Sequence, residues 1–382
     1  MARVIVVLQH RGGHLAVENA QPKILVADAT PAQDLRSPES FVSLYTNLMC
    51  EVRDEGLLNR RYLWYWTTIF VAIASFVGIW AGIFLLGNSW FQLILAAALG
   101  VVATQFGFIG HDGAHRQMFK SAAWNEWTSR ILSGAFAGLS FGWWRTKHNK
   151  HHAAPNQEDK DPDIGPGAIA FTRAIVERRT GFAGWFAQHQ GWFFFPLLTL
   201  EGLNLHRESV QTVLRPHSVP HQRVEAVLIF ARLISYVAVL LMVLPVGKAA
   251  AFFFLQMAIF GLCLGGSFAP NHKGMPIVPA TMKIDFLRRQ VLMSRNVRGG
   301  LFVDFFMGGL NYQIEHHLFP SMPRANLKLA QPIVRAYCDK HGVSYSEVGL
   351  FASYAIVVRY LNNVGLRARD PFECPLAQQF RG

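Results

Sequence analysis

The chain has 382 residues, of which 51% are hydrophobic and only 16% are charged, and its formal net charge at pH 7 is +12. A soluble globular domain usually carries about 25% charged residues, so this composition excludes an ordinary soluble enzyme, and the high apolar content excludes a disordered chain. A chain that is both apolar and basic is typical of a membrane protein whose spanning helices have basic flanks.

The first long apolar stretch runs from Tyr62 to Gly110 and contains no charged residue. It is long enough for two helical crossings of a hydrocarbon core of roughly 30 Å. The turn-forming residues Gly87 to Ser89 predict spans near residues 63–86 and 90–110. We expect the preceding residues, 1–60, to form a cytoplasmic N-terminal tail with an amphipathic lead-in to the membrane.

The second long apolar stretch runs from Val224 to Phe268 and is interrupted by a turn from Pro245 to Lys248. It predicts two further spans, near residues 226–245 and 249–268. The turns within both predicted hairpins are therefore very short, and a long segment separates the two hairpins.

The apolar segments include one charged residue within a predicted span and two stretches that are too short or too interrupted to span. Arg232 lies inside the third predicted span, where its long side chain could reach toward the lipid headgroups. Two shorter apolar segments, residues 131–142 and 182–203, are short or interrupted by polar residues. They fit interfacial or re-entrant helices better than membrane spans.

Lys and Arg are concentrated outside the hairpin turns, which together hold only Lys248. Seven lie in residues 1–61, thirteen in residues 111–223 and fourteen in residues 271–382. By the positive-inside rule, both termini and the long middle segment face the cytoplasm. Because these bases flank the spans and form no separate basic domain, no nucleic-acid partner is expected.

The predicted fold is an all-α integral membrane protein with four transmembrane helices, arranged as two hairpins, and a cytoplasmic helical cap. Residues 61–345 would form the membrane domain, and residues 346–382 would form a cytoplasmic C-terminal tail. The four cysteines share no spacing that indicates a disulfide framework or a thiolate metal site.

Eight of the 15 histidines lie in four short stretches near the predicted cytoplasmic ends of the spans. These stretches are HDGAH (residues 111–115), HNKHH (148–152), NH (271–272) and QIEHH (313–317). Residues three and four apart share one helix face, so the histidines of each longer stretch can point at the same metal ion. Imidazole suits Fe, Zn, Cu and Ni, and eight imidazoles exceed what one ion takes, so the pattern predicts a site for two ions. A structural zinc site would normally include cysteine.

The motifs HDxxH, HNxxHH and QxxHH, in this order, resemble the histidine boxes of the membrane fatty acid desaturase family. The surrounding residues are similar too: His148 to Asp163 reads HNKHHAAPNQEDKDPD, and Gln313 to Pro320 reads QIEHHLFP. Glutamine at the start of the third box resembles the front-end branch, which includes Δ5, Δ6 and sphingolipid Δ8 desaturases. The resemblance covers roughly residues 60–345.

The resemblance implies that two iron ions form a di-iron centre held by His111, His115, His148, His151, His152, His272, His316 and His317. Gln313 could ligate directly, act through water or only shape the site, and Asn271 could contribute in place of His272. Residues expected to contact the metal or to fix the imidazoles from behind are Asp112, Asn149, Asn156, Asp159, Asp163 and Glu315. No catalytic side chain beyond the metal centre is expected.

The resemblance further implies an O₂-dependent fatty acyl desaturase, which removes two hydrogens from adjacent methylenes and leaves a cis double bond while O₂ is reduced to water. An unactivated C–H bond offers no acidic proton and no leaving group, so acid–base residues alone cannot attack it. A hydroxylase or ketolase on the same scaffold is the alternative, because the ligands do not reveal whether oxygen is transferred. A metal transporter is disfavoured, since transporters place their ligands near the bilayer midplane.

The substrate would be a fatty acyl chain, linked to CoA or to a lipid, and Trp143 and Trp144 are either walls of an acyl tunnel or interfacial anchors. Many front-end desaturases carry a fused cytochrome b5-like domain with an HPGG motif. The nearest match here, HRGGH at His10 to His14, lacks the proline, so we expect no such domain. Electrons would come from a separate ferredoxin or cytochrome b5-type protein and its reductase. The basic cytoplasmic face would suit an acidic donor or the anionic headgroups of membrane lipids.

Overall fold

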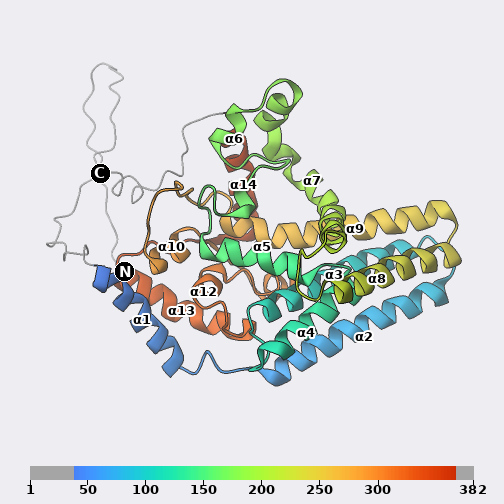
Figure 1. Cartoon of the computed structure of the whole chain (residues 1–382), viewed down its shortest axis with the longest axis horizontal. Coiled ribbons are helices and arrows are strands. Elements are labelled where there is room, and N and C mark those ends of the chain that lie inside the picture. The colour runs from blue at the N-terminus through green and yellow to red at the C-terminus, as the bar shows by residue number, and fades with distance from the viewer. Residues whose placement is uncertain (1–37, 367–382) are drawn as a thin grey trace, which may run out of the picture.

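The structure, a computed structural model, describes residues 38–366. The expectations for residues 1–37, including the motif at His10 to His14, and for residues 367–382 lie outside the described residues. The described part is mainly helical, with one short two-stranded sheet. Four long helices run side by side toward one end of the molecule, and shorter helices gather at the other end (Figure 1).

The four long helices are apolar and long enough to cross a membrane. They are α2 (Tyr62–Leu86), α3 (Gln92–Ala114), α8 (Gln222–Val243) and α9 (Val246–His272). Helices α2 and α3 form one hairpin, and α8 and α9 form the other, with only a few residues in each turn. The prediction of an all-α protein with four candidate spans in two hairpins is therefore confirmed. Both α3 and α9 extend about one turn beyond the predicted ends at residues 110 and 268.

Arg232 does not reach toward a headgroup region, as the sequence suggested, but is buried inside the helical bundle. Its guanidinium lies over the rings of Phe76, Trp80 and Tyr236, at 4.6–5.7 Å from the ring centroids. Its Nε donates a hydrogen bond of 3.1 Å to the backbone oxygen of Phe136. These aromatic faces and the carbonyl replace the water that the charge would otherwise require.

The two shorter apolar segments form parts of longer elements. Helix α4 (Ala122–Leu132) continues into a π-helical turn (Ser133–Ala137), which ends at Gly138 with a φ of +75°. The segment 182–203 belongs to α7 (Gly181–Leu214), a helix of 34 residues with Pro196 in its interior. Helix α7 packs along α9. The membrane-interface placement of both segments stays a prediction.

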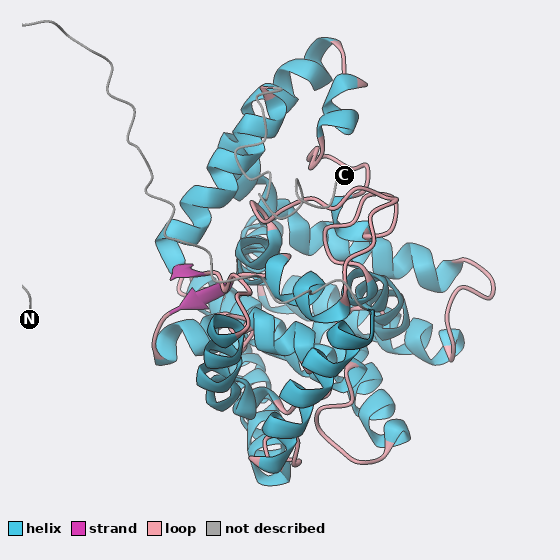
Figure 2. Cartoon of the chain, turned by 90° about the vertical axis from the view of Figure 1, so that its left-hand side faces the viewer, coloured by secondary structure: helices cyan, strands magenta, loops and turns pink. Residues whose placement is uncertain are grey.

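The cap contains α1 (Pro38–Asp54), α5 (Phe141–Ala153), α10 (Phe286–Leu292), α11 (Leu301–Phe306), α12 (Gln313–Leu318) and α13 (Arg324–Lys340). Short elements connect them, namely a 3₁₀ turn (Pro162–Ile164), α6 (Arg173–Glu177) and the parallel strands β1 (Asn296–Arg298) and β2 (Glu347–Gly349). Figure 2 shows this strand pair at the edge of the helical body. Helices α1, α10, α12 and α13 share one apolar core around Leu318 and Phe319.

The segment after residue 345, expected to be a tail, contains helix α14 (Leu350–Gly365). One face of α14 packs against α7 and α9, and Val357, Tyr360 and Leu361 are fully buried there. The packed part of the chain therefore extends at least to Gly365. An amphipathic helix with this apolar face is more stable when packed than in water.

Candidate metal centre

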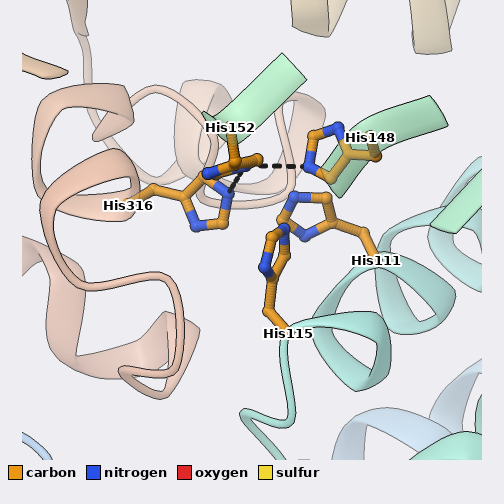
Figure 3. Close-up of side chains that lie close together, drawn as sticks. All are labelled: His111, His115, His148, His152 and His316. Atoms are coloured by element: carbon orange, nitrogen blue, oxygen red, sulfur yellow. Dashed lines mark hydrogen bonds between the residues drawn. The ribbon is translucent and has the colours of Figure 1, made fainter. Parts of the chain in front are cut away.

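Five histidines from three helices converge at the cap end of the spanning helices. His111 and His115 come from the end of α3, His148 and His152 from α5, and His316 from α12, and their rings point toward one another (Figure 3). One ligand nitrogen from each lies within 4.8 Å of the others. The Nε2 of His152 is 3.0 Å from that of His148 and 3.1 Å from that of His316.

The other three predicted ligands form a second cluster beside the first. His151, His272 and His317 bring one nitrogen each within 4.8 Å of one another, and all three are buried. The rings of His152 and His317 stack at 4.1 Å between centroids, so the two clusters adjoin. All eight predicted ligands are thus brought together, divided into a five-histidine cluster and a three-histidine cluster.

Hydrogen bonds at Nδ1 determine the tautomers in the three-histidine cluster. The Nδ1 of His272 lies 2.9 Å from the backbone oxygen of Met293, and that of His151 lies 3.0 Å from both carboxylate oxygens of Asp161. The Nδ1 of His317 lies 2.9 Å from the Oε1 of Gln290. These oxygens only accept, so each Nδ1 carries the proton and each Nε2 offers its lone pair to the cluster.

Burial keeps five of the clustered imidazoles neutral. It lowers the pKa of His115 to about 3, and burial together with neighbouring imidazoles lowers the pKa values of His148, His152, His316 and His317 well below the usual range. The Nε2 atoms of His111, His115 and His317 are buried without a hydrogen-bond partner in the described structure. Buried, neutral nitrogens with unused lone pairs fit a transition metal such as iron. The clusters include none of the described cysteines, as a structural zinc site usually would.

The fatty acid desaturase family model matches residues 88–349, which include all eight of these histidines. This chain belongs to the fatty acid desaturase family. It is 33% identical to an acyl-lipid (9-3)-desaturase of Physcomitrium patens over 288 residues, which cover 73% of this chain and 54% of the relative. It is 29% identical to a Delta(6)-fatty-acid desaturase of Caenorhabditis elegans over 358 residues, 88% of this chain and 77% of the relative.

A third relative acts on a different class of lipid according to its name. The chain is 28% identical to a Delta 8-(E)-sphingolipid desaturase of Kluyveromyces lactis over 378 residues, which cover 94% of this chain and 65% of the relative. The chain thus spans between about half and about three quarters of the length of these three desaturases. The predicted membership of the membrane fatty acid desaturases is confirmed.

No sequence motif indicated Asp161, the carboxylate that contacts His151 most closely. Asp161 is buried and also accepts hydrogen bonds from the backbone nitrogens of Asn156 and Asp163, at 2.7 and 2.9 Å. Burial alone would raise the pKa of Asp161, but the contacts with His151 and the charge of Lys273 together lower it, so the group is a carboxylate. Its position before Pro162, as the cap of the 3₁₀ turn, was the only local signal for it.

Three of the polar residues expected around the centre do contact its framework. The Oδ1 of Asp112 lies 3.4 Å from the Nδ1 of His111, and its Oδ2 lies 3.0 Å from the Nε of Arg324. An Oδ2–Nδ1 distance of 3.5 Å joins Asp163 to His151. Asn156 acts on the backbone, because its Nδ2 donates to the oxygen of His272 at 3.1 Å.

Three other residues that were expected to support the imidazoles make no hydrogen bond to an imidazole in the described structure. Asn149 is exposed because it lies on the outer face of α5, and Asp159 is exposed in a left-handed turn with a φ of +62°. Among the described residues neither has a hydrogen bond to an imidazole. Glu315 is buried but supports α12 from behind, since it accepts hydrogen bonds from Asn296 at 2.7 Å and from the hydroxyl of Tyr345 at 2.6 Å. Burial raises the pKa of Glu315 to about 7.

Buried polar residues outside the motifs hold the ligand-bearing helices in place. Glu225 accepts hydrogen bonds from Ser140 and from the nitrogen of Gly142, which fixes the start of α5. Arg295 donates to the backbone oxygens of Pro270 and Lys273, which fixes the end of α9 next to His272. A cationic side chain at the carboxyl end of a helix also complements the helix dipole.

A cavity of about 210 Å³ lies between α5, α7 and α9 and reaches both histidine clusters. Its walls include His148, His151 and His272, and the ring of Trp144 stacks on that of His148 at 4.3 Å. Trp143 and Trp144 both line the cavity, which is the position that a wall of an acyl tunnel would have. The other apolar wall residues are Phe171, Phe194, Leu198, Leu205, Leu264, Gly265, Phe268 and Ala269, and the charged ones are Lys147, Asp163, Glu201 and Lys273.

Proposed function

We propose that this chain is an O₂-dependent fatty acyl desaturase whose two irons are held by the five-histidine and three-histidine clusters. The observation that carries the proposal is the pair of adjoining clusters of largely buried imidazoles beside a largely apolar cavity. The eight nitrogens fit two ions of a metal that prefers imidazole. When bound, a pair of irons together with O₂ supplies the oxidising power needed to break two unactivated C–H bonds.

The cavity is proposed to hold the acyl chain so that its methylenes pass the histidine clusters. Phe194, Leu198 and Phe268 are apolar, so they would exclude water from the bound acyl chain and offer no hydrogen-bonding group in its place. Because Trp144 packs flat against His148, the acyl chain would contact the indole and not the edge of the imidazole. Only methylenes that stop beside His148, His151 and His272 would then react.

The charged groups of the cavity are proposed to position the polar end of the substrate, which is linked to CoA or to a lipid. The Nζ of Lys147 lies 2.9 Å from a carboxylate oxygen of Asp163, and the Nζ of Lys273 donates to the backbone oxygen of Asp163 at the same distance. Burial opposes the ionisation of Asp163, but Lys147 and other cations lower its pKa overall. Both lysines line the cavity next to candidate ligands, so the polar end would bind close to the reacting carbons.

The orientation in the membrane and the electron donor are also proposed. The histidine clusters lie at the ends of α3 and α9, and the distribution of Lys and Arg supports a cytoplasmic location for this end and for both termini. Lys150 and Lys160 are exposed near the clusters. Their charge supports docking of an acidic electron carrier, either a ferredoxin or a cytochrome b5-type protein, which is reduced by its own reductase.

Two measurements test the proposal. The purified protein should contain about two irons per chain, and a host without such enzymes should gain an unsaturated fatty acid when it expresses the chain. His316→Ala should abolish the new product, whereas His217→Asn, at an exposed histidine outside the clusters, should not.

Product mass separates desaturation from the alternative. A desaturated product is lighter by two hydrogens, whereas a hydroxylase or ketolase product retains an added oxygen. Stoichiometric zinc without iron, or an oxygenated product alone, would overturn the proposal.

A further inference from the structure

Gln313, the first residue of the third motif, is buried beside the three-histidine cluster. Its Nε2 lies 2.9 Å from the Nε2 of His272. A glutamine can act on a metal site in two opposite ways, because its carbonyl oxygen can ligate a cation whereas its NH₂ group can only donate hydrogen bonds. The direction in which the amide points therefore determines what Gln313 does.

The neighbouring Asn271 has a fixed orientation. Its Nδ2 lies 3.0 Å from the backbone oxygen of Ser267 and 3.0 Å from that of Leu310. Backbone carbonyls only accept hydrogen bonds, so the NH₂ group must face both of them. A reversed amide would place its oxygen against two carbonyl oxygens, and Asn271 is fully buried, so no solvent could relieve that contact.

The orientation of Asn271 then determines the orientation of Gln313. The Nδ2 of Asn271 lies 3.1 Å from the Oε1 of Gln313. A reversed Gln313 would bring two NH₂ groups together with no acceptor between them. The Nε2 of Gln313 therefore faces the Nε2 of His272, which carries no proton because the Nδ1 of His272 donates to Met293.

We infer that Gln313 presents an N–H donor to the three-histidine cluster and is not a metal ligand. This inference rests on the proposed function. An amide nitrogen does not ligate through its lone pair, which is delocalised into the carbonyl. The three-histidine cluster thus has three protein ligands and one position lined by an N–H group, which can hold a water molecule or an oxygen of the substrate. Gln313 is a positioning residue, and the two metal positions are unequal.

Metal retention tests the inference without relying on activity. The full-length protein is loaded with Fe²⁺, and the iron per chain is measured during a challenge with a chelator. Gln313→Leu, which removes both polar atoms at similar volume, should keep two irons, with a retention time within about threefold of the parent. If the Oε1 of Gln313 were a ligand, the variant should lose one iron at least ~10–100-fold faster than the parent. Substitution of a residue that only supports a metal ligand already lowers metal affinity by about that factor.

A double substitution tests the orientation itself. Asn271→Asp places an oxygen where the NH₂ group was, which favours a Gln313 that turns its own NH₂ toward residue 271 and its oxygen toward the cluster. The same oxygen also faces the backbone oxygens of Ser267 and Leu310, so the folding of this variant is checked separately. In this background Gln313→Leu should shorten iron retention by at least tenfold, although it has little effect alone, and additive effects would refute the inference. Iron in the five-histidine cluster reports whether the Asn271→Asp protein is folded, and Gln313→Leu alone remains decisive if it is not.

The outcomes separate this inference from the proposed function. A parent protein that binds no iron refutes the proposed function. A parent protein with two irons and a Gln313→Leu variant with one refutes only the donor role of Gln313.

Discussion

Asp161→Asn should selectively weaken the three-histidine cluster. In the native chain, both oxygens of Asp161 lie 3.0 Å from the Nδ1 of His151, and the same oxygens accept from the backbone nitrogens of Asn156 and Asp163. An asparagine has one oxygen and one NH₂ group. At least one of these three donors would therefore face another donor in a buried site.

The size of the effect follows from these contacts. A hydrogen bond to a charged group contributes about 1.5–3 kcal/mol, and substitution of a residue that supports a metal-bound histidine typically lowers metal affinity ~10–100-fold. The two figures agree, since a tenfold change corresponds to about 1.4 kcal/mol. The effect should be confined to the three-histidine cluster, because Asp161 contacts no member of the five-histidine cluster in the described structure.

The assay is iron content during a chelator challenge, with the chain in detergent or in nanodiscs. Asp161→Asn should fall from two irons to one per chain about 10–100 times faster than the parent, and the second iron should stay. Asp159→Asn is the matched control, because Asp159 lies in the same loop but is exposed. If both variants retained two irons equally well, the assigned role of Asp161 in fixing His151 would be wrong.

Three further substitutions test the packing around the centre. Glu225→Gln should lower stability by about 1–3 kcal/mol, because it removes one of the two carboxylates that contact the buried guanidinium of Arg130, the other being Glu126, and thermal unfolding measures this. Tyr345→Phe removes the hydroxyl that donates to buried Glu315 at 2.6 Å and should cost about 1–3 kcal/mol in the same assay. Gly265→Val should shift the products toward shorter acyl chains at unchanged iron content, because the added side chain narrows the cavity. Even a Cβ at Gly265 would lie 2.5 Å from a side-chain atom of Leu198, which also lines the cavity. Fatty acid analysis checks this shift.

Each of these substitutions has a control of the same chemical type. Glu177→Gln and Tyr62→Phe change exposed side chains, and Gly247→Val changes a glycine of α9 with open space around it. A control that destabilised the protein as much as its partner would show that the loss is not specific to the buried contact. Unchanged products from Gly265→Val would exclude this wall of the cavity from acyl binding.

Much of the fold could be predicted from the sequence because the signals are local. The uncharged stretch from Tyr62 to Gly110 can only be stable out of water, and its length matches two crossings. Spacings of three and four residues place histidines on one helix face whatever surrounds the helix. The eight candidate ligands were therefore identified before any contact between the helices was known.

The division of the eight histidines was decided by tertiary structure alone. His151 and His152 are adjacent in α5 and point about 100° apart, so they enter different clusters, and the same holds for His316 and His317 in α12. The cluster that each histidine enters depends on how α3, α5, α9 and α12 pack together. These helices come from parts of the chain that lie up to about 200 residues apart. The role of Asp161 in place of Asp159, the burial of Arg232 and the orientation of Gln313 depend on such distant contacts too. Local spacing determines which residues can share a helix face, whereas only the packed fold determines what that face meets.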